Sequence, residues 1–417
     1  MKIVVCNYRY FVTGGPERYM FSLFELLKNN GHQPIPFSVA YNNNRETPYR
    51  RYFVSSPGDP DQVYFNELHL SPFRKLRSAM NVVYSFEARQ KLEWLLRDER
   101  PDIVQTLHIP TVLSFSLIDA AKSRGLPVVS RLSNYHLLCP TEHFLRDNRV
   151  CEECKKSLFN AIKYKCARNS VSLSGLRVLS LWFHRWKRTY DKIDSFIVPS
   201  HFLRSKLIEY GFPESKVDYL PSFVNISEFK PSFKFEDYIV YSGRIAVEKG
   251  VPDLIKAFSR VAANVKLVIV GNDRNPEGDK VKRCVEGCDL SNIKFLGYQP
   301  LPRLKKILQN ALFTVCPSIW YENSPMSTYE SFALGKPVLG SRIGSINEQV
   351  IEGRTGLLFE PGNIDDLADK MNYLIHHRPK LVDMGKEARK IVEQEHSPEV
   401  HYDKLMAVYD KLIQQYK

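Results

Sequence analysis

The chain has 417 residues, of which 43% are hydrophobic and 25% are charged, as in a globular protein large enough for two or three domains. Its formal net charge of +13 implies anionic partners such as sugar phosphates, acidic lipid headgroups or nucleic acid. No apolar run approaches the roughly 18 residues of a membrane span, and the first residues read as a strand, not a signal peptide. Eight cysteines without a secretion signal favour a reducing compartment, so we expect a cytoplasmic protein.

Strands and helices alternate through the first half of the chain, which predicts a parallel sheet covered by helices. The first strand leads through Gly14 and Gly15 into a helix that ends near residue 30. Strands are expected at residues 3–6, 34–39, 102–107, 127–131, 195–198 and 217–220, and helices at residues 79–97, 112–123, 176–187 and 201–210. Residues 41–75 read as loops, and residues 139–170 are irregular and carry four cysteines.

A second series of strands follows residues 223–236, which hold Pro, Ser and Lys without periodicity and read as a linker. Its strands are expected at residues 238–241, 265–270, 293–296, 312–316, 337–339 and 356–359, with helices between them, the first ending at residue 263. We therefore expect an N-terminal domain at 1–222, a linker at 223–236, a C-terminal domain at 237–396 and a final helix within 397–417. That helix is expected to pack back toward the N-terminal domain.

Two such domains would face each other across a cleft, and ligands bind beyond the carboxyl ends of parallel strands. Gly14, His108, Gly243 and Glu322 each follow an expected strand. The pattern therefore places the loops that carry these residues at one cleft.

Two glutamates flank an expected helix start after the strand at 312–316. Ser324 suits the N-cap and Pro325 the first helical position, so Glu322 lies in the loop. Glu330 then lies roughly 8 Å into the helix, at about 1.5 Å per residue. The helix start favours phosphate, and the carboxylates can accept hydrogen bonds from sugar hydroxyls. For this spacing alone, two solvated glutamates are the alternative.

Two bases, Arg244 and Lys249, lie in a turn between a strand and a helix. Arginine offers a planar fork and lysine a point charge, and both can hold a diphosphate. In a transfer reaction that expels a nucleoside diphosphate, they would stabilise the charge that develops on the leaving group. An ordinary turn with two solvated bases is the alternative.

Together these motifs resemble the retaining group 1 enzymes of glycosyltransferase family 4, over nearly the whole chain. The matching pieces are Gly14-Gly15 with Glu17, Pro101-Asp102-Ile103-Val104 with His108, Gly125-Leu126-Pro127-Val128-Val129, Pro199-Ser200, Gly243-Arg244 with Lys249-Gly250, Leu267-Val268-Ile269-Val270-Gly271, Phe295-Leu296-Gly297, Glu322 with Glu330, Gly335-Lys336-Pro337-Val338 and Gly356-Leu357-Leu358. The resemblance implies the α/β fold named GT-B, in which two Rossmann-like parallel-sheet domains face a central cleft.

The resemblance also implies roles for individual residues. Arg244 and Lys249 would hold the donor diphosphate, Glu330 the ribose hydroxyls, and Glu322 would face the donor sugar. The other expected binding positions are Gly14, Gly15, Gly243, Asn323, Ser324, Pro325 and Met326. The donor would be a UDP- or GDP-sugar, the anomeric configuration would be kept, and no metal cofactor would be required.

The acceptor implied by the resemblance is a glycan or lipid-linked glycan in capsule, O-antigen or other surface polysaccharide assembly. Related enzymes with a Leu-Leu-Cys-Pro segment carry a proposed catalytic histidine before it, at the position of Ser133 here. Asn134 or His136 is a candidate substitute, and His108 also follows a strand toward the cleft. A structural hydrogen-bonding role is the alternative for each.

Four cysteines, Cys139, Cys151, Cys154 and Cys166, form a C-x11-C-x2-C-x11-C pattern in a basic segment. The central C-x2-C suits a structural, tetrahedral zinc site. An iron–sulfur cluster and unliganded thiols in a loop are the alternatives.

Between residues 155 and 192 the chain has ten Lys or Arg and one Asp, with Trp182, Phe183 and Trp186 among them. Mixed basic and aromatic residues on a helix suit an anionic membrane surface, here the inner face of the plasma membrane. No nucleic-acid-binding module is recognised, so nucleic acid is not an expected partner. A sugar-nucleotide 2-epimerase of the same architecture, or a non-enzymatic basic protein that binds membranes or nucleic acid, is the alternative function.

Overall fold

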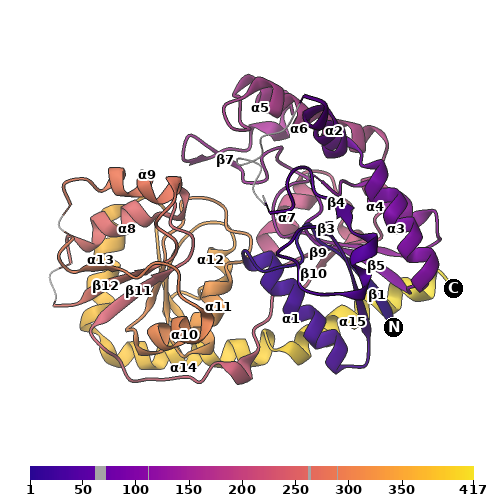
Figure 1. Ribbon diagram of the computed structural model, residues 1–417. Coiled ribbons are helices and arrows are strands. Elements are labelled where there is room, and N and C mark those ends of the chain that lie inside the picture. Colours follow the sequence, from indigo (N-terminus) through magenta and orange to yellow (C-terminus); the bar gives the residue numbers. More distant parts are fainter. Residues whose placement is uncertain (62–71, 111, 262–263, 289) are drawn as a thin grey trace.

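The computed structural model describes residues 1–61, 72–110, 112–261, 264–288 and 290–417. The expected loop at 62–71 and the end of an expected helix at 262–263 lie outside these ranges. Within them the chain forms two lobes, each built on a six-stranded parallel sheet (Figure 1). None of the helices in these ranges combines the length and the apolar character needed to cross a bilayer.

The N-terminal sheet is covered on both faces. Along β1, Val4 and Cys6 belong to one buried cluster, and Ile3 and Val5 belong to another. Successive side chains of a strand point to opposite faces, so this short apolar run requires helices on both sides of the sheet. In spatial order the strands are β10 (Val217–Tyr219), β9 (Ser195–Val198), β6 (Val128–Arg131), β5 (Ile103–Thr106), β1 (Lys2–Cys6) and β2 (Gln33–Phe37).

The helices of the N-terminal lobe follow the expected order, with several differences. The first helix after the expected loop starts at Pro72, the helix expected at 112–123 starts at Ser116, and residues 160–163 form a short helix in the segment expected to be irregular. Two further changes are caused by serine caps. The expected helix at 79–97 is two helices, because Ser85 ends the first and caps the second by accepting from Ala88 N (3.3 Å). Ser170 caps α6 in the same way (3.3 Å from Leu173 N), so that helix starts five residues earlier than expected. The helices are α1 (Gly15–Asn29), α2 (Pro72–Val83), α3 (Phe86–Glu99), α4 (Ser116–Lys122), α5 (Asn160–Lys163), α6 (Val171–Trp186) and α7 (His201–Glu209).

The remaining strands of this lobe are short. A parallel pair is formed by β3 (Val39–Ala40) and β4 (Val54–Ser55), and a hairpin by β7 (Leu145–Arg146) and β8 (Arg149–Val150). The hairpin lies in the cysteine-bearing segment, whose loops extend from the end of β6 toward the second lobe (Figure 1).

The C-terminal lobe repeats the architecture. Its strands, in spatial order, are β13 (Ile293–Phe295), β12 (Lys266–Val270), β11 (Tyr238–Ser242), β14 (Thr314–Cys316), β15 (Val338–Ser341) and β16 (Gly356–Phe359). Its helices are α8 (Val251–Phe258), α9 (Pro276–Cys284), α10 (Leu301–Asn310), α11 (Met326–Ala333), α12 (Ile346–Gln349), α13 (Ile364–His376) and α14 (Arg378–Glu395). The predicted fold class, two Rossmann-like parallel-sheet domains, is confirmed.

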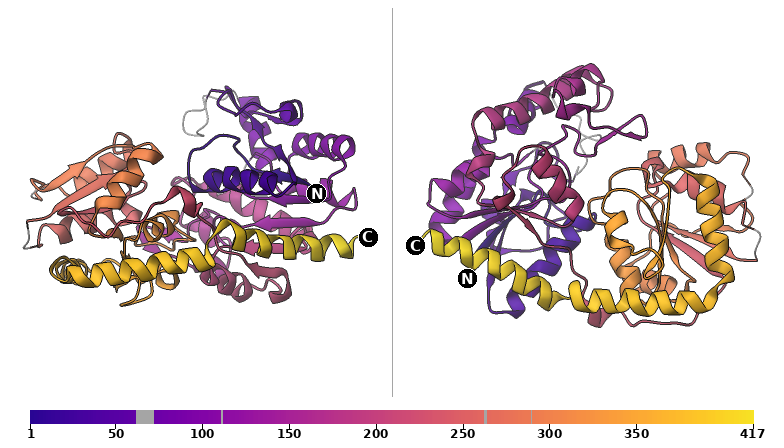
Figure 2. Two further views of the ribbon diagram at one scale, coloured as in Figure 1. Left: turned by 90° about the horizontal axis from the view of Figure 1, so that it is seen from below. Right: turned by 180° about the vertical axis from the view of Figure 1, so that it is seen from behind.

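The last helix, α15 (Pro398–Gln415), belongs in space to the first lobe. Helix α14 runs along the second lobe, and α15 continues past the junction and packs beside α1 (Figure 2). Leu405 and Tyr409 are fully buried in the same cluster as α1. The expected linker passes the same place, where Val224 N donates to His396 O (3.0 Å). The two lobes are therefore joined by two adjacent crossings of the chain.

Two buried histidines hold this junction. His401 Nδ1 lies 2.9 Å from Pro221 O, and its Nε2 lies 3.0 Å from the Tyr19 hydroxyl. His396 Nδ1 lies 3.2 Å from Ser222 O. Burial lowers the pKa of His396 to about 4 and that of His401 to about 3. Both rings are therefore neutral at physiological pH, with each Nδ1–H donating to a carbonyl.

The junction predicts a specific acid sensitivity. An unfolded histidine titrates near pH 6.5, so the unfolded chain binds more protons than the folded chain below that pH. This contribution to stability is complete above pH 6.5 and is lost as the pH falls toward 4. We expect His401→Gln to melt several degrees lower at pH 8 and to lose less melting temperature than wild type between pH 8 and pH 5. The exposed His376→Gln is the matched control, and parallel pH profiles for all three proteins would contradict this account.

Candidate active site

Lys249 and Glu322 form a buried ion pair at the carboxyl end of the C-terminal sheet. Lys249 follows β11, Glu322 follows the neighbouring strand β14, and Lys249 Nζ lies 2.6 Å from Glu322 Oε1. Ser318 Oγ (2.6 Å) and Trp320 Nε1 (2.8 Å) donate to the same oxygen. The Glu322 side chain is 9% exposed. The structure thus brings together two residues that the sequence predicted at one site.

The partners decide the charge of Glu322. Burial alone would raise the pKa of this carboxyl, but the Lys249 charge and the three hydrogen bonds outweigh burial and hold the pKa below its ordinary value. Glu322 is therefore an anion at physiological pH. All three bonds end on Oε1, so Oε2 is left for a ligand hydroxyl.

Gly250 explains how the lysine reaches this position. Its φ is +70°, and a Cβ there would lie 1.8 Å from Pro317 O. The turn that carries Lys249 therefore passes directly against the loop that carries Ser318 and Glu322, and an L side chain would force them apart.

The helix after Glu322 starts one residue later than predicted. α11 begins at Met326 with Pro325 as its N-cap, and the Ser324 hydroxyl does not cap it. Ser324 Oγ instead accepts from Gln349 Nε2 (3.3 Å). The free N–H groups still face the loop of Glu322, because the helix follows that loop directly.

Glu330 lies in α11 and is bound by the other lobe. Arg18 Nη1, from α1, lies 3.0 Å from Glu330 Oε1, and the Glu330 side chain is 9% exposed. Burial raises the pKa of Glu330, and the Arg18 charge offsets part of that rise. Sequence reasoning missed Arg18. One feature of the sequence could have indicated Arg18: it is a cation near the start of a helix, where the macrodipole disfavours positive charge.

Arg244 is placed differently from Lys249. Its Nη2 lies 2.5 Å from Glu248 Oε1, and half of its side chain is exposed. The Arg244 charge also acts on His143 in the N-terminal lobe, and the His143 ring lies 5.2 Å from the Trp320 ring. Arg244 thus lies at the mouth between the lobes, while Lys249 lies inside.

The loop of Glu322 also contacts the N-terminal lobe. The Tyr135 hydroxyl donates to Glu322 O (3.2 Å), and Asn323 Nδ2 donates to Leu132 O (3.0 Å). The Asn323 side chain is thus occupied by the other lobe, which leaves its backbone as the part available to a ligand.

A second polar group lies in the N-terminal lobe around Glu142, which the sequence did not single out. Glu142 accepts from Asn134 Nδ2 (2.7 Å) and Arg177 Nη1 (2.6 Å), and His108 Nε2 lies 3.5 Å away. Burial opposes ionisation, yet His108 and Arg177 hold the pKa of Glu142 well below its usual range. Its φ of +73° is rare for a residue with a side chain. Glu142 thus fixes two predicted catalytic candidates, His108 and Asn134.

His136 belongs to the same group. Its Nδ1 is hydrogen-bonded to Asn134 Oδ1, and burial lowers its pKa to about 4. Its Nε2 is buried without a hydrogen-bond partner among the described residues. The ring lines a cavity of about 30 Å³ together with Glu142, Arg177 and Ser180. A neutral ring nitrogen without a partner is suited to a ligand hydroxyl.

Gly14 is the N-cap of α1 and Gly15 its first residue, so both lie where the first N–H groups of the helix have no intrahelical partner. No heavy atom lies within 4 Å of the place where a Gly15 Cβ would be, and the nearest to Gly14 is at 3.8 Å. Neither glycine is required by packing, so the open space in front of α1 fits the close approach of a ligand.

The four cysteines of the insertion do not form a metal site as placed. They are free thiols, and within the described residues no three His, Cys, Asp or Glu side chains are arranged to hold an ion. Burial raises the pKa of Cys154 to about 12, and the other three cysteines lie close enough to contribute electrostatically to this rise. Zinc binding stays a prediction from the spacing alone.

Curated proteins similar in sequence include glycosyltransferases and a protein of a cps region. The glycosyltransferase MJ1178 of Methanocaldococcus jannaschii is 33% identical over 154 residues, 36% of this chain and 42% of that protein. A protein of the cps region of Klebsiella pneumoniae is 25% identical over 84% of this chain and 87% of its own length. The lipopolysaccharide 1,2-N-acetylglucosaminetransferase of Salmonella typhimurium is 29% identical over 44% of this chain and 53% of that protein. The chain thus matches about half or less of MJ1178 and the Salmonella enzyme.

Solved structures share the fold over the whole chain. Sucrose-phosphate synthase from Thermosynechococcus elongatus has a TM-score of 0.72 at 17% identity and covers 99% of both chains. Anabaena HepE in complex with UDP and glucose has a TM-score of 0.69 at 14% identity and covers 99% of this chain and 100% of that one. At such low identity these likenesses establish the fold alone.

Two family models together account for most of the sequence. The model described as glycosyl transferases group 1 matches residues 224–391. The model described as Glycosyltransferase Family 4 matches residues 13–228, just over half of the chain. The chain therefore belongs to glycosyltransferase family 4 and carries a C-terminal domain of the group 1 type.

Proposed function

We propose that the chain transfers a sugar from a nucleotide-diphosphate sugar to a glycan or lipid-linked glycan during surface polysaccharide assembly. The observation that carries the proposal is the buried Lys249–Glu322 pair at the carboxyl end of the C-terminal sheet, where the loop of Glu322 leads into the helix that carries Glu330. It offers one cation and two carboxylates to a ligand with a diphosphate between two sugars. The epimerase and the non-enzymatic alternatives are not favoured, because the similar curated proteins include a lipopolysaccharide 1,2-N-acetylglucosaminetransferase and a capsular polysaccharide biosynthesis glycosyltransferase.

In this arrangement the donor lies across the end of the C-terminal sheet. Glu330 accepts from the ribose hydroxyls, Lys249 faces the diphosphate, and the free Oε2 of Glu322 accepts from a hydroxyl of the donor sugar. Arg244 reaches the diphosphate from the mouth by leaving Glu248. The backbone of residues 323–326 and the start of α11 supply N–H groups. UDP and GDP are the candidate nucleotides.

The same groups supply the chemistry. Positive charge held at the diphosphate stabilises the leaving group as the bond to the sugar breaks, which gives the site its own electrophilic assistance without a metal cofactor. The departing phosphate oxygen takes the proton of the acceptor hydroxyl on the face that it leaves, so the anomeric configuration is kept. Contact between the lobes excludes water that would hydrolyse the donor.

The acceptor side is the group around Glu142. It presents His108, Asn134 and the unpartnered Nε2 of His136 from the N-terminal lobe. The neutral ring of His136 and the Asn134 amide can bind sugar hydroxyls, and the Tyr135 hydroxyl ties this loop to Glu322 O (3.2 Å). The acceptor hydroxyl would thus approach the donor carbon from this lobe.

A thermal-shift screen of UDP- and GDP-sugars tests the donor. A ligand at one hundred times its dissociation constant stabilises the folded state by about 2.7 kcal/mol, which raises the melting temperature measurably. The hit is then incubated with acceptor glycans, and release of the nucleoside diphosphate and the anomeric NMR signal of the product are followed with and without chelator. A chain that no nucleotide sugar stabilises, or that converts the donor without an acceptor, would contradict the proposal.

Arg18 is expected to set the pH dependence of donor binding. Glu330 must be ionised to accept from ribose, and its pKa is already raised by burial, so affinity increases as the pH rises through that pKa. Arg18→Gln removes the charge that offsets burial, which raises the pKa further. We expect weaker nucleotide binding and a binding profile displaced to higher pH between pH 5 and 8.

Calorimetric titration of the nucleoside diphosphate at several pH values measures this shift. Lys28→Gln, on the exposed face at the far end of the same helix, is the matched control and should retain the wild-type profile. If Arg18→Gln binds more weakly at every pH by the same factor, Arg18 does not act through Glu330.

A further inference from the structure

Helix α6 presents large apolar side chains to solvent on the face turned away from the domain core. Leu179, Trp182 and Trp186 follow one another at spacings of three and four residues, so they share one face of the helix. They are 47%, 54% and 70% exposed. The two indole rings stack with centroids 6.3 Å apart and planes 9° from parallel. Exposed apolar residues that are contiguous, unlike single ones, mark an interaction surface.

A series of ring contacts, which passes through the buried Tyr84, links this face of α6 to Phe86 at the start of α3. Trp186 lies 6.3 Å from the Phe183 ring, Phe183 lies 6.1 Å from Tyr84, and Tyr84 lies 5.0 Å from Phe86. Phe86 is 68% exposed. We call Phe86, Leu179, Trp182 and Trp186 the aromatic patch. Three of these residues share one face of α6, and Phe86 is joined to them through the Phe183 and Tyr84 rings.

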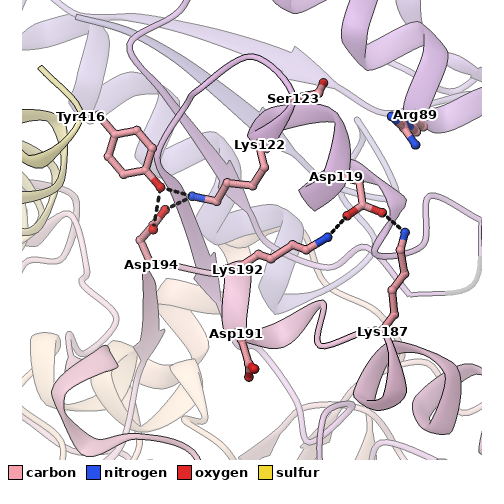
Figure 3. A pocket seen from close by; sticks show the side chains of 9 residues that line it. All are labelled: Arg89, Asp119, Lys122, Ser123, Lys187, Asp191, Lys192, Asp194 and Tyr416. Carbon is pink, nitrogen blue, oxygen red and sulfur yellow. Dashed lines mark hydrogen bonds and ion pairs between the residues drawn. The ribbon is translucent and has the colours of Figure 1, made fainter.

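An open groove of about 680 Å³ lies at the C-terminal end of α6, where its lining includes Lys187, the residue after Trp186 (Figure 3). Lys187 Nζ, which lines the groove, lies 4.5 Å from the centre of the Tyr84 ring. The lining residues are Arg89, Asp119, Lys122, Ser123, Lys187, Asp191, Lys192, Asp194 and Tyr416. Four of these are cations and three are carboxylates, so the charge balance depends on how they pair.

The pairing leaves positive charge on the open side of the groove. Asp119 is 8% exposed and bonds both Lys187 and Lys192, so two cations share one carboxylate. Lys122 pairs with Asp194 deeper in the groove (Figure 3). Beside the groove, Arg188 is 81% exposed and pairs with Asp191 across 2.6 Å. The groove lining holds four cations against three carboxylates, and the exposed Arg188 lies beside it, so this end of the lobe carries a small excess of positive charge that suits an anionic surface.

The opposite face of α6 belongs to the acceptor side of the site. Arg177 Nη1 lies 2.6 Å from Glu142 Oε1, and Ser180 and Leu181 line the small cavity that His136 also lines. One helix, roughly 10 Å across, therefore separates the aromatic patch from the group that would receive the acceptor.

We propose that the aromatic patch and the basic groove dock the N-terminal lobe on a bilayer that contains anionic phospholipid. Indole rings favour the headgroup region, where one edge is apolar and the N–H is solvated. Lysine and arginine beside them are attracted by the negative surface potential. Docking here would hold the cleft near a lipid-linked acceptor. That docking brings the site to a lipid-linked acceptor rests on the proposed function. Binding of the chain to a bilayer does not depend on turnover.

Co-sedimentation of the full chain with vesicles tests the proposal. We expect binding to phosphatidylcholine vesicles that contain phosphatidylglycerol, with a blue shift of tryptophan fluorescence, and much weaker binding to phosphatidylcholine alone. Trp182→Ser with Trp186→Ser should weaken binding about tenfold. Tyr298→Ser, which removes an aromatic ring that is 73% exposed on the other lobe, is the matched control and should bind as wild type.

The charge contribution is tested in the same assay. Arg188→Glu should weaken binding to the anionic vesicles about fivefold or more, whereas Lys280→Glu, at a 53% exposed side chain of the C-terminal lobe, should not. Absence of vesicle binding, or equal binding by the double tryptophan variant, would overturn the proposal. Loss of a dimer or of RNA binding in that variant, with vesicle binding unchanged, would assign the patch to a second copy or to nucleic acid. Thermal shift by the donor nucleotide, intact in every variant, separates docking from the donor site.

Discussion

Replacing Lys249 with Met is expected to lower turnover by a factor of about 10² to 10³. The leaving diphosphate loses the lysine that Glu322 holds inside the site, where solvent screening is weak. The same change leaves the Glu322 carboxylate buried with only Ser318 and Trp320 as donors. Breaking a buried ion pair on one side costs about 3 kcal/mol, so the melting temperature should fall as well. Single-turnover kinetics and thermal melts measure the two effects.

A double variant separates catalysis from stability. Lys249→Met with Glu322→Gln removes both charges, so no uncompensated carboxylate remains, and most of the lost stability should return. Turnover should not return, because the leaving group is still without its cation. Lys280→Met, an exposed lysine of the same lobe, controls for loss of charge. Recovery of turnover together with stability would show that Lys249 is structural.

Replacing Glu142 with Gln is expected to reduce transfer to the acceptor by about 10², with donor affinity unchanged within twofold. The carboxylate is the shared partner of His108, Asn134 and Arg177, and an amide cannot accept from all of them. Nucleoside diphosphate release with and without acceptor, beside calorimetry of donor binding, separates the two steps.

The backbone at Glu142 provides a second variant. Its φ of +73° disfavours any residue with a Cβ by about 1 kcal/mol, so Glu142→Gly relieves the backbone while it removes the carboxylate. A variant that melts close to wild type and yet fails in transfer would establish a role in the acceptor site. Full transfer by Glu142→Gly would show that the group around Glu142 only stabilises the loop.

The fold of the C-terminal lobe could be predicted from local sequence patterns. The βα turn with Lys249 and the loop with Glu322 each come directly after a strand, and parallel topology brings such positions to one edge of the sheet. The predicted Ser324 cap was wrong, because Gln349 from a later helix bonds that hydroxyl. A contact between residues far apart in the sequence cannot be recognised from the spacing of residues in a local motif.

The contacts between the lobes could not be predicted for the same reason. Arg18 and Glu330 are 312 positions apart, and the local sequence around one does not indicate that the other is its partner. Glu142 lies in an irregular segment where no periodicity indicates which side chain turns inward. Its signature is a left-handed backbone conformation and a set of donors from three segments, and both become visible only in the fold.

The most direct test of the account is calorimetric titration of the donor nucleoside diphosphate and of the matching monophosphate into wild type, Lys249→Met and Glu330→Gln. If Lys249 grips the diphosphate and Glu330 the ribose, the diphosphate binds wild type at least tenfold more tightly than the monophosphate, a difference of about 1.4 kcal/mol. Lys249→Met should remove that preference, and Glu330→Gln should weaken both ligands alike. Equal affinity of wild type for the two nucleotides, or a preference that survives Lys249→Met, would contradict the proposed site.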